Sequence, residues 1–271
     1  MSSGTPFRRL RLFLIITFAI TWGAWWALAA LVPSGGLKFD NVPIMSLYIL
    51  GGFGPTIAAL ISVFATPAEG SFQEFTRRLY RWRVNAIWYV FALAFPTVLE
   101  FSSLKITSAL GATPAAPFVL KAWWQIIPLF GTMIVGGGLE ELGWRGVAQP
   151  AMEKHAAPPL AATMIGAIWV SWHLPLFFIP GTAQFHSSFL IFTVFTFGNT
   201  FVLAWLYART QSILLCVGFH AASNASSGMH LPVPAGNPPY AAVAALLNLA
   251  VGASLLLGDA TRRRVIAPRR A

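Results

Sequence analysis

Residues 10–31, LRLFLIITFAITWGAWWALAAL, form an apolar and aromatic run that follows a short basic cluster. A helix needs about 20 mainly apolar residues to cross the hydrocarbon core of a bilayer. The run ends near Ala27-Leu28-Ala29, which also resembles a cleaved signal peptide, but the apolar core of such a peptide is usually only about 7–15 residues long. The length therefore favours a retained first transmembrane helix.

The composition of the whole chain agrees with that interpretation. Of the 271 residues, 56% are hydrophobic and only 10% are charged, and the chain contains 11 Trp and 22 Phe. An ordinary soluble domain has about 25% charged residues. The sequence therefore predicts an all-α, polytopic membrane protein. Cys216, the single cysteine, excludes an internal disulfide and is expected to be a packed apolar side chain.

Apolar runs separated by Pro and Gly predict about eight transmembrane helices. They lie near residues 10–32, 44–66, 86–110, 119–139, 158–179, 186–208, 211–228 and 239–258. The fourth is expected to continue as a helix to about residue 153. We find no internal repeat and no polar second domain. The chain is predicted to be a single membrane domain, 1–271, with a motif-bearing core at about 119–228.

The net charge of +10 is concentrated in clusters between the apolar runs. The three clusters are Arg8, Arg9 and Arg11; Arg77, Arg78, Arg81 and Arg83; and Arg262, Arg263, Arg264, Arg269 and Arg270. Basic loops of this kind are held on the cytoplasmic side. We therefore expect both termini to be cytoplasmic, in what we take to be a bacterial cytoplasmic membrane. No basic face of a soluble fold is present to bind nucleic acid.

The segment from Ser71 to Arg83 predicts a helix that lies in the membrane interface. Ser71 and Glu74 have the spacing of a capping box. Phe72, Phe75, Leu79 and Trp82 would share one helical face. The arginines would face anionic lipid headgroups. A solvated connecting loop is the alternative.

Ionisable groups inside a membrane are costly and usually mark function. With one neutral amide, they are Glu100, Glu140, Glu141, Arg145, His173, His220 and Asn224. Glu141 and Arg145 are four residues apart on a helix, so they are expected to pair as a structural support. Glu140 has no basic residue three or four positions away, and glycines surround it in 136–146, GGGLEELGWRG. This predicts a general base beside a close helix contact or an approaching substrate.

Two further segments carry polar side chains. His173 follows Trp169 by one turn and precedes Pro175, which should end the helix. A lone histidine of this kind is more often a satisfied core group than a catalyst. His220 and Asn224 share one helical face and could hold the oxyanion of a tetrahedral intermediate. Together the three spans fit hydrolysis of an amide bond in a membrane cavity.

The three motifs resemble those of the CAAX protease and bacteriocin-processing family of intramembrane proteases. They are Glu140-Glu141-x-x-x-Arg145, an aromatic-x-x-x-His ending at His173, and His220-x-x-x-Asn224. The resemblance implies eight helices and cleavage near the C-terminus of membrane-associated protein substrates. Carried over by motif, Glu140 and His173 activate water, His220 and Asn224 stabilise the oxyanion, and Glu141 and Arg145 support the site. The family usually has phenylalanine where this chain has Trp169, which puts the shape of the cavity in question.

The requirement for a metal stays open at this point. Glu140, His173 and His220 could form an open zinc site of the His₂Glu type, and the family is often labelled metalloprotease. No HExxH motif is present, and Asn224 is a poor zinc ligand, so water activation without a metal is favoured. The other hypotheses are a proton-coupled transporter, with Glu100 in a relay, and a non-catalytic bacteriocin-immunity protein of the same fold.

Overall fold

The computed structural model describes residues 7–32, 36–38, 40–111, 123–229 and 238–266, and the regular structure in these ranges is helical. The longer helices are α1 (Arg8–Leu31), α2 (Val42–Gly52), α3 (Gly54–Ala65), α4 (Phe72–Leu79), α5 (Ala86–Ala109), α6 (Ile126–Val135), α9 (Pro158–Trp172), α10 (Phe189–Thr210), α11 (Ile213–Met229) and α12 (Pro238–Ile266). The short turns are η1 (Pro67–Glu69), η2 (Trp123–Gln125), η3 (Gly138–Glu140), α7 (Glu141–Gly143), η4 (Trp144–Ala148), α8 (Gln149–Met152) and η5 (Leu174–Phe178).

Among the described residues, six helices are long and apolar enough to cross a membrane. A seventh span is possible if α2 and α3, which meet at 51°, are counted together. The bend falls at Phe53, just before Gly54-Pro55, where proline removes a backbone donor. The remaining predicted span, 211–228, corresponds to α11, which has only 17 residues and carries His220 and Asn224. The polytopic all-α fold is confirmed, with fewer full-length spans than the eight expected.

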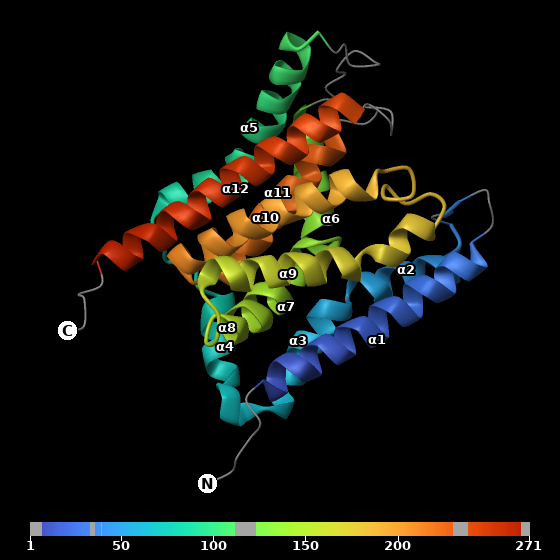
Figure 1. The fold of residues 1–271 in the computed structure, drawn as a ribbon. Coiled ribbons are helices and arrows are strands. Elements are labelled where there is room, and N and C mark those ends of the chain that lie inside the picture. The colour runs from blue at the N-terminus through green and yellow to red at the C-terminus, as the bar shows by residue number, and fades with distance from the viewer. Residues whose placement is uncertain (1–6, 33–35, 39, 112–122, 230–237, 267–271) are drawn as a thin grey trace.

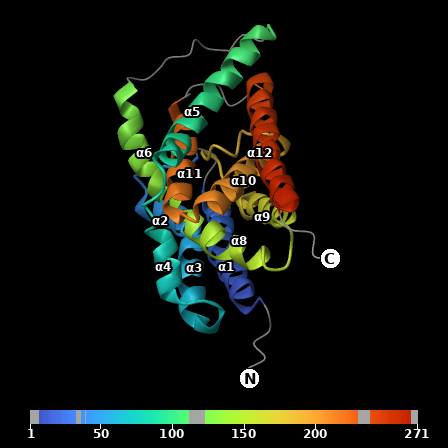
Figure 2. The same ribbon diagram turned by 90° about the vertical axis from the view of Figure 1, so that its left-hand side faces the viewer.

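The helices form two groups with α9 between them in Figure 1. Helix α1 packs against α2 and α3, while α10 packs against α12 and α9. Helix α11 contacts α5 on one side and α6 on another, and it also touches η3 and α7. Figure 2 shows the same helices from the side, with α11 among its neighbours. Helix α11 thus brings its polar residues to the segment that carries the Glu-Glu pair.

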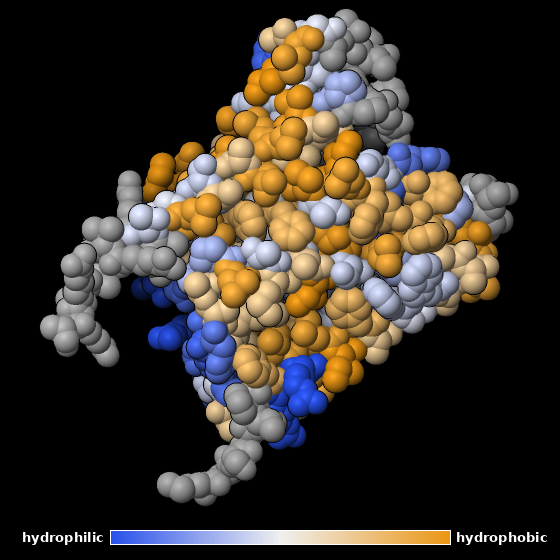
Figure 3. Space-filling view, in the orientation of Figure 1, coloured by the Kyte–Doolittle hydropathy of each residue, from blue (hydrophilic) through white to orange (hydrophobic). Residues whose placement is uncertain are grey.

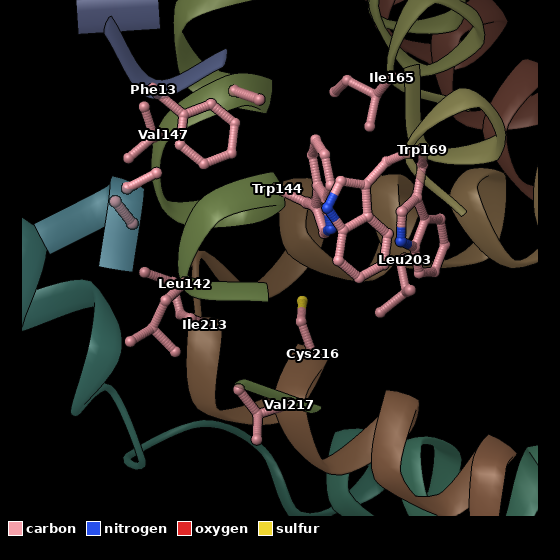
Figure 4. Packing of buried hydrophobic residues seen from close by; sticks show 14 of the residues in the cluster. Phe13, Leu142, Trp144, Val147, Ile165, Trp169, Leu203, Ile213, Cys216 and Val217 are labelled. Atoms are coloured by element: carbon pink, nitrogen blue, oxygen red, sulfur yellow. The ribbon is translucent and has the colours of Figure 1, made fainter. Parts of the chain in front are cut away.

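A large apolar core joins these helices, and it is rich in aromatic side chains. Its fully buried members include Phe13, Trp144, Trp172 and Phe219. Figure 4 shows Trp144 and Trp169 side by side above Cys216 in this core. Cys216 is fully buried and reduced, which confirms its predicted role as a packed side chain.

The segment after α6 is not the continuous α-helix that we expected up to residue 153. It passes through the 3₁₀ turn η3, the short α7, the π-helical turn η4 and then α8. Two glycines explain how tightly it packs. A Cβ at Gly138 would lie 2.9 Å from the carbonyl oxygen of Val217, and one at Gly143 would lie 2.9 Å from that of Pro55. Only glycine permits backbones to approach this closely.

Helix α4 occupies the predicted interfacial segment. The side chain of Ser71 accepts a hydrogen bond from the backbone N–H of Glu74 at 3.1 Å, which is one half of the expected capping box. In Figure 1 the start of α1 and the end of α12 lie toward the same side as α4 and α8. Figure 3 shows hydrophilic surface on that side and hydrophobic surface over most of the visible face. The assignment of that side to the cytoplasm stays a prediction.

Candidate active site

A cavity of about 260 Å³ lies where α2, α9, α10, α11 and η3 meet. Its lining includes all four predicted catalytic residues: Glu140, His173, His220 and Asn224. Apolar and aromatic side chains such as Ile49 line much of the remainder. Residues from three separate segments of the sequence thus share one space.

Glu140 ends the turn η3 and is 7% exposed. Its Oε2 accepts hydrogen bonds from two indole N–H groups, those of Trp169 at 2.9 Å and Trp144 at 3.3 Å. Within the described part of the chain, Oε1 of Glu140 has no hydrogen-bond partner. One oxygen of this carboxylate is therefore held, and the other is left for a ligand in the cavity.

The side chain of Glu141 is fully buried, and its carboxylate contacts two partners. Its Oε2 lies 3.0 Å from Nε of Arg145, which is also fully buried, so the pair predicted from the i, i+4 spacing is present. Its Oε1 lies 2.9 Å from Nδ1 of His220. The second contact was not expected from the sequence. Glu141 therefore joins the supporting arginine to a histidine of the cavity.

His173 caps the C-terminus of α9, which ends at Trp172 as the following Pro175 predicted. Its Nδ1 lies 2.8 Å from the backbone carbonyl oxygen of Trp169. A carbonyl oxygen only accepts hydrogen bonds, so Nδ1 must carry the proton and Nε2 is the free acceptor of the neutral ring. The ring also makes edge contacts with Trp172 and Phe192, at centroid distances of 4.5 Å and 5.0 Å.

His220 and Asn224 lie on one face of α11 and approach the backbone of Gly137. A Cβ at Gly137 would lie 3.2 Å from Nε2 of His220 and closer still to Nδ2 of Asn224. The absence of a side chain at this position lets both nitrogen atoms sit beside η3. Because Glu141 accepts from Nδ1 of His220, the ring is oriented with Nε2 toward this place.

Some polar neighbours of the cavity were missed in the sequence. Trp144 was not assigned a role, although its i+4 spacing from Glu140 places it on the same helical face. Asn199, which lines the cavity, was absent from our set of polar groups within the membrane. Its Oδ1 accepts a hydrogen bond from Asn248 at 3.0 Å, so it joins α10 to α12. The sequence signal that could have identified Asn199 is its isolated amide side chain within an apolar span.

Glu100 was a candidate for a relay, but it does not line the cavity. It accepts hydrogen bonds from the hydroxyls of Ser227, at 3.0 Å, and Tyr240. These partners place it between α5, α11 and α12. The structure thus separates Glu100 from Glu140 and the two histidines.

The geometry of the donor atoms does not fit a three-ligand metal site. In the described ranges, no three His, Cys, Asp or Glu side chains are grouped so that they could hold a metal ion.

Comparison with known proteins points to the same family as the motifs. The model of the Rce1-like family, described as type II CAAX prenyl endopeptidases, matches residues 122–226. The CAAX prenyl protease 2 of Methanococcus maripaludis is 24% identical over 222 residues, which cover 78% of this chain and 80% of that protein. These similarities, together with the three motifs gathered around one cavity, support a relationship between this chain and the CAAX proteases.

Proposed function

We propose that this protein hydrolyses a peptide bond inside the cavity, with a water molecule activated by Glu140 and His173. The proposal rests on the arrangement of hydrogen-bond acceptors and donors around the cavity. Glu140 and His173 each present a free acceptor atom, while His220 and Asn224 present nitrogen atoms that can donate. Hydrolysis of an amide needs both kinds of group.

The two acceptors would bind and deprotonate the water. Oε1 of Glu140 and Nε2 of His173 each accept a hydrogen bond from it. Glu140 then takes the proton as the water oxygen bonds to the carbonyl carbon of the substrate. The same proton passes to the leaving nitrogen when the carbon–nitrogen bond breaks, so the base returns to its starting state.

The two donors would stabilise the negative charge that develops on the carbonyl oxygen. Nδ2 of Asn224 supplies one N–H group, and Nε2 of His220 supplies another when the ring is protonated at both nitrogens. Glu141 favours that form of the ring by accepting from Nδ1, and Arg145 balances the charge of Glu141. Removing one donor that is held in place before the reaction typically lowers kcat by roughly 10²- to 10³-fold.

For the substrate, we propose the C-terminal region of a membrane-associated protein that carries a prenyl group. The matched family model and the relative from Methanococcus maripaludis are both named for CAAX prenyl substrates. The cavity lining supports the idea, since polar groups lie near Glu140 while Ile49, Phe53 and Val135 offer an apolar wall. A bilayer-facing protease would meet such a lipid-modified chain at the membrane.

The test compares purified wild-type protein with Glu140→Ala and His173→Ala variants in lipid vesicles. The probe is a peptide ending in a prenylated cysteine plus three residues, with the same peptide lacking the lipid as a second arm. Mass spectrometry should find the three-residue product from wild type only, and more of it from the prenylated peptide. Glu74→Ala, which removes an exposed carboxylate of α4, is the matched control.

Three results would separate the parts of the proposal. Unchanged cleavage by either cavity variant would contradict the mechanism. Equal cleavage of both peptides would contradict the lipid preference alone. Loss of activity after treatment with a zinc chelator, with recovery on adding zinc, would show that a metal takes part. We expect the activity to survive the chelator.

A transporter is less well supported by the contacts. The relay of that hypothesis needs Glu100 to communicate with Glu140, yet Glu100 is bonded to Ser227 and Tyr240 outside the cavity lining. The possibility of a non-catalytic immunity protein is addressed by the cleavage assay itself.

A further inference from the structure

We propose that Trp169, assisted by Trp144, is a positioning residue that fixes the Glu140 carboxylate so that Oε1 alone receives the proton of the water. This inference rests on the proposed peptidase function and adds the assignment of the reacting oxygen. The family pattern does not supply it, because phenylalanine at this position has no N–H group to donate.

The geometry comes from two separate parts of the chain. Trp169 belongs to α9, and Trp144 belongs to the π-helical turn η4. Their indole N–H groups converge on the same oxygen of Glu140, at 2.9 Å and 3.3 Å. An indole N–H can only donate. Both bonds therefore engage Oε2 as an acceptor and leave Oε1 as the free oxygen toward the cavity.

Packing holds the two donors still. Trp144 is fully buried, and Trp169 is 3% exposed. The ring of Trp144 makes edge contacts with Phe13 and Trp172, at centroid distances of 5.5 Å and 6.1 Å. The centroids of Trp144 and Trp169 are 6.4 Å apart, and Figure 4 shows the two rings side by side. Supporting groups locked by packing are what hold a catalytic group in its productive geometry.

The π-helical turn contributes to this arrangement. A π-turn widens the helix locally and often occurs at functional sites. Here it begins at Trp144, directly after α7, and the backbone N–H of Gln149 bonds to the carbonyl oxygen of Trp144. The side chain of Trp144 still reaches Glu140, four residues earlier. The turn therefore anchors the second donor next to the carboxylate.

As a consequence, the two carboxylate oxygens of Glu140 have different chemical roles. Water transfers a proton to Oε1, and its oxygen forms the new bond to the carbonyl carbon. The two hydrogen bonds from the indole N–H groups to Oε2 persist through this step and keep the carboxylate from rotating. The proton later leaves Oε1 for the amine of the departing fragment. No additional reactant is needed.

The first experiment measures kcat and KM for Trp169→Phe, which keeps an aromatic ring and removes the N–H group. We expect kcat to fall by about 10- to 100-fold, the range for losing a hydrogen bond to a charged group, with KM changed by less than about threefold. Trp144→Phe, which loses the longer bond, should lower kcat less. Trp172→Phe is the matched comparison, because its buried N–H donates to Thr21 at 2.8 Å and not to Glu140.

A double-mutant cycle distinguishes positioning from general damage to the fold. Glu140→Asp shortens the side chain and withdraws the carboxylate from the indoles. If Trp169 acts through this carboxylate, Trp169→Phe should reduce kcat much less in the Glu140→Asp background than in wild type. Thermal unfolding in detergent identifies any variant that has lost its fold.

The proposal is overturned if Trp169→Phe keeps the wild-type kcat, changes KM alone, or loses no more kcat than Trp172→Phe. Additive effects of Trp169→Phe and Glu140→Asp would overturn it as well. These outcomes differ from failure of the proposed function, in which wild-type protein would cleave neither peptide. Active wild type, inactive Glu140→Ala and fully active Trp169→Phe would contradict the indole arrangement alone.

Discussion

Glu140 and Glu100 are two buried carboxylates within the membrane-spanning helices, and they have similar immediate surroundings. Their exposed fractions are 7% and 5%, and each accepts hydrogen bonds from at least two side chains. Glu140 borders the cavity together with two histidines and an asparagine, while Glu100 lies outside its lining. Burial and satisfied hydrogen bonds therefore do not distinguish the two carboxylates. Only Glu140 lines a cavity beside polar groups that could act with it on a reactant.

The largest expected effect concerns the ion pair that supports the Glu140 region. Arg145→Met should lower the free energy of unfolding by about 3–5 kcal/mol, because it leaves Glu141 buried beside a histidine without its cation. Arg209→Met breaks the pair between Arg209 and Asp259, 3.3 Å apart, in which the arginine side chain is 40% exposed. This should change stability by no more than about 1 kcal/mol. Denaturation of both variants in the same detergent checks the difference, and equal losses would contradict the supporting role.

The second effect concerns the donors beside the cavity. Gly137→Ala adds a Cβ that would press on Nε2 of His220 and Nδ2 of Asn224. We expect kcat/KM to fall by about 100-fold, the size of losing one oxyanion donor. Gly131→Ala is the control, because a Cβ there meets nothing within 4 Å among the described residues. Full activity of Gly137→Ala would show that these donors are not used in their present positions.

The smallest expected effect belongs to the Glu100 region. Tyr240→Phe removes a hydroxyl that donates to Glu100. Stability should fall by about 1–2 kcal/mol, while kcat/KM should stay within about twofold of wild type. Trp169→Phe removes a comparable donor from Glu140 and should reduce kcat instead. Similar losses of activity in Tyr240→Phe and Trp169→Phe would contradict the proposed functional difference between the Glu100 and Glu140 regions.

Local spacing in the sequence predicted those parts of the site that lie a few residues apart along the chain. The i, i+4 rule placed Glu141 beside Arg145 and placed His220 and Asn224 on one face. Pro175 marked the end of α9. Apolar length predicted the all-α membrane fold, although it did not distinguish the bent pair α2–α3 or the short α11 from full spans.

Contacts between helices could not be predicted in the same way. The approach of Trp169 to Glu140 depends on how α9 is placed beside η3, and the pairing of Glu141 with His220 depends on how α11 packs against α7. No periodicity in one segment contains that information. The glycines at 138 and 143 indicated that some close approach would occur, but not which backbone would come near.

The most direct test of the account compares Glu140→Gln with Glu100→Gln in the same lipid vesicles. Both changes remove a buried carboxylate and keep its shape. Single-turnover cleavage of the prenylated peptide should slow by about 1,000-fold in Glu140→Gln, which cannot accept the proton of the water, and by no more than about threefold in Glu100→Gln. If the two variants cleave at similar rates, or if Glu100→Gln is the slower, the assignment of Glu140 as the base is wrong.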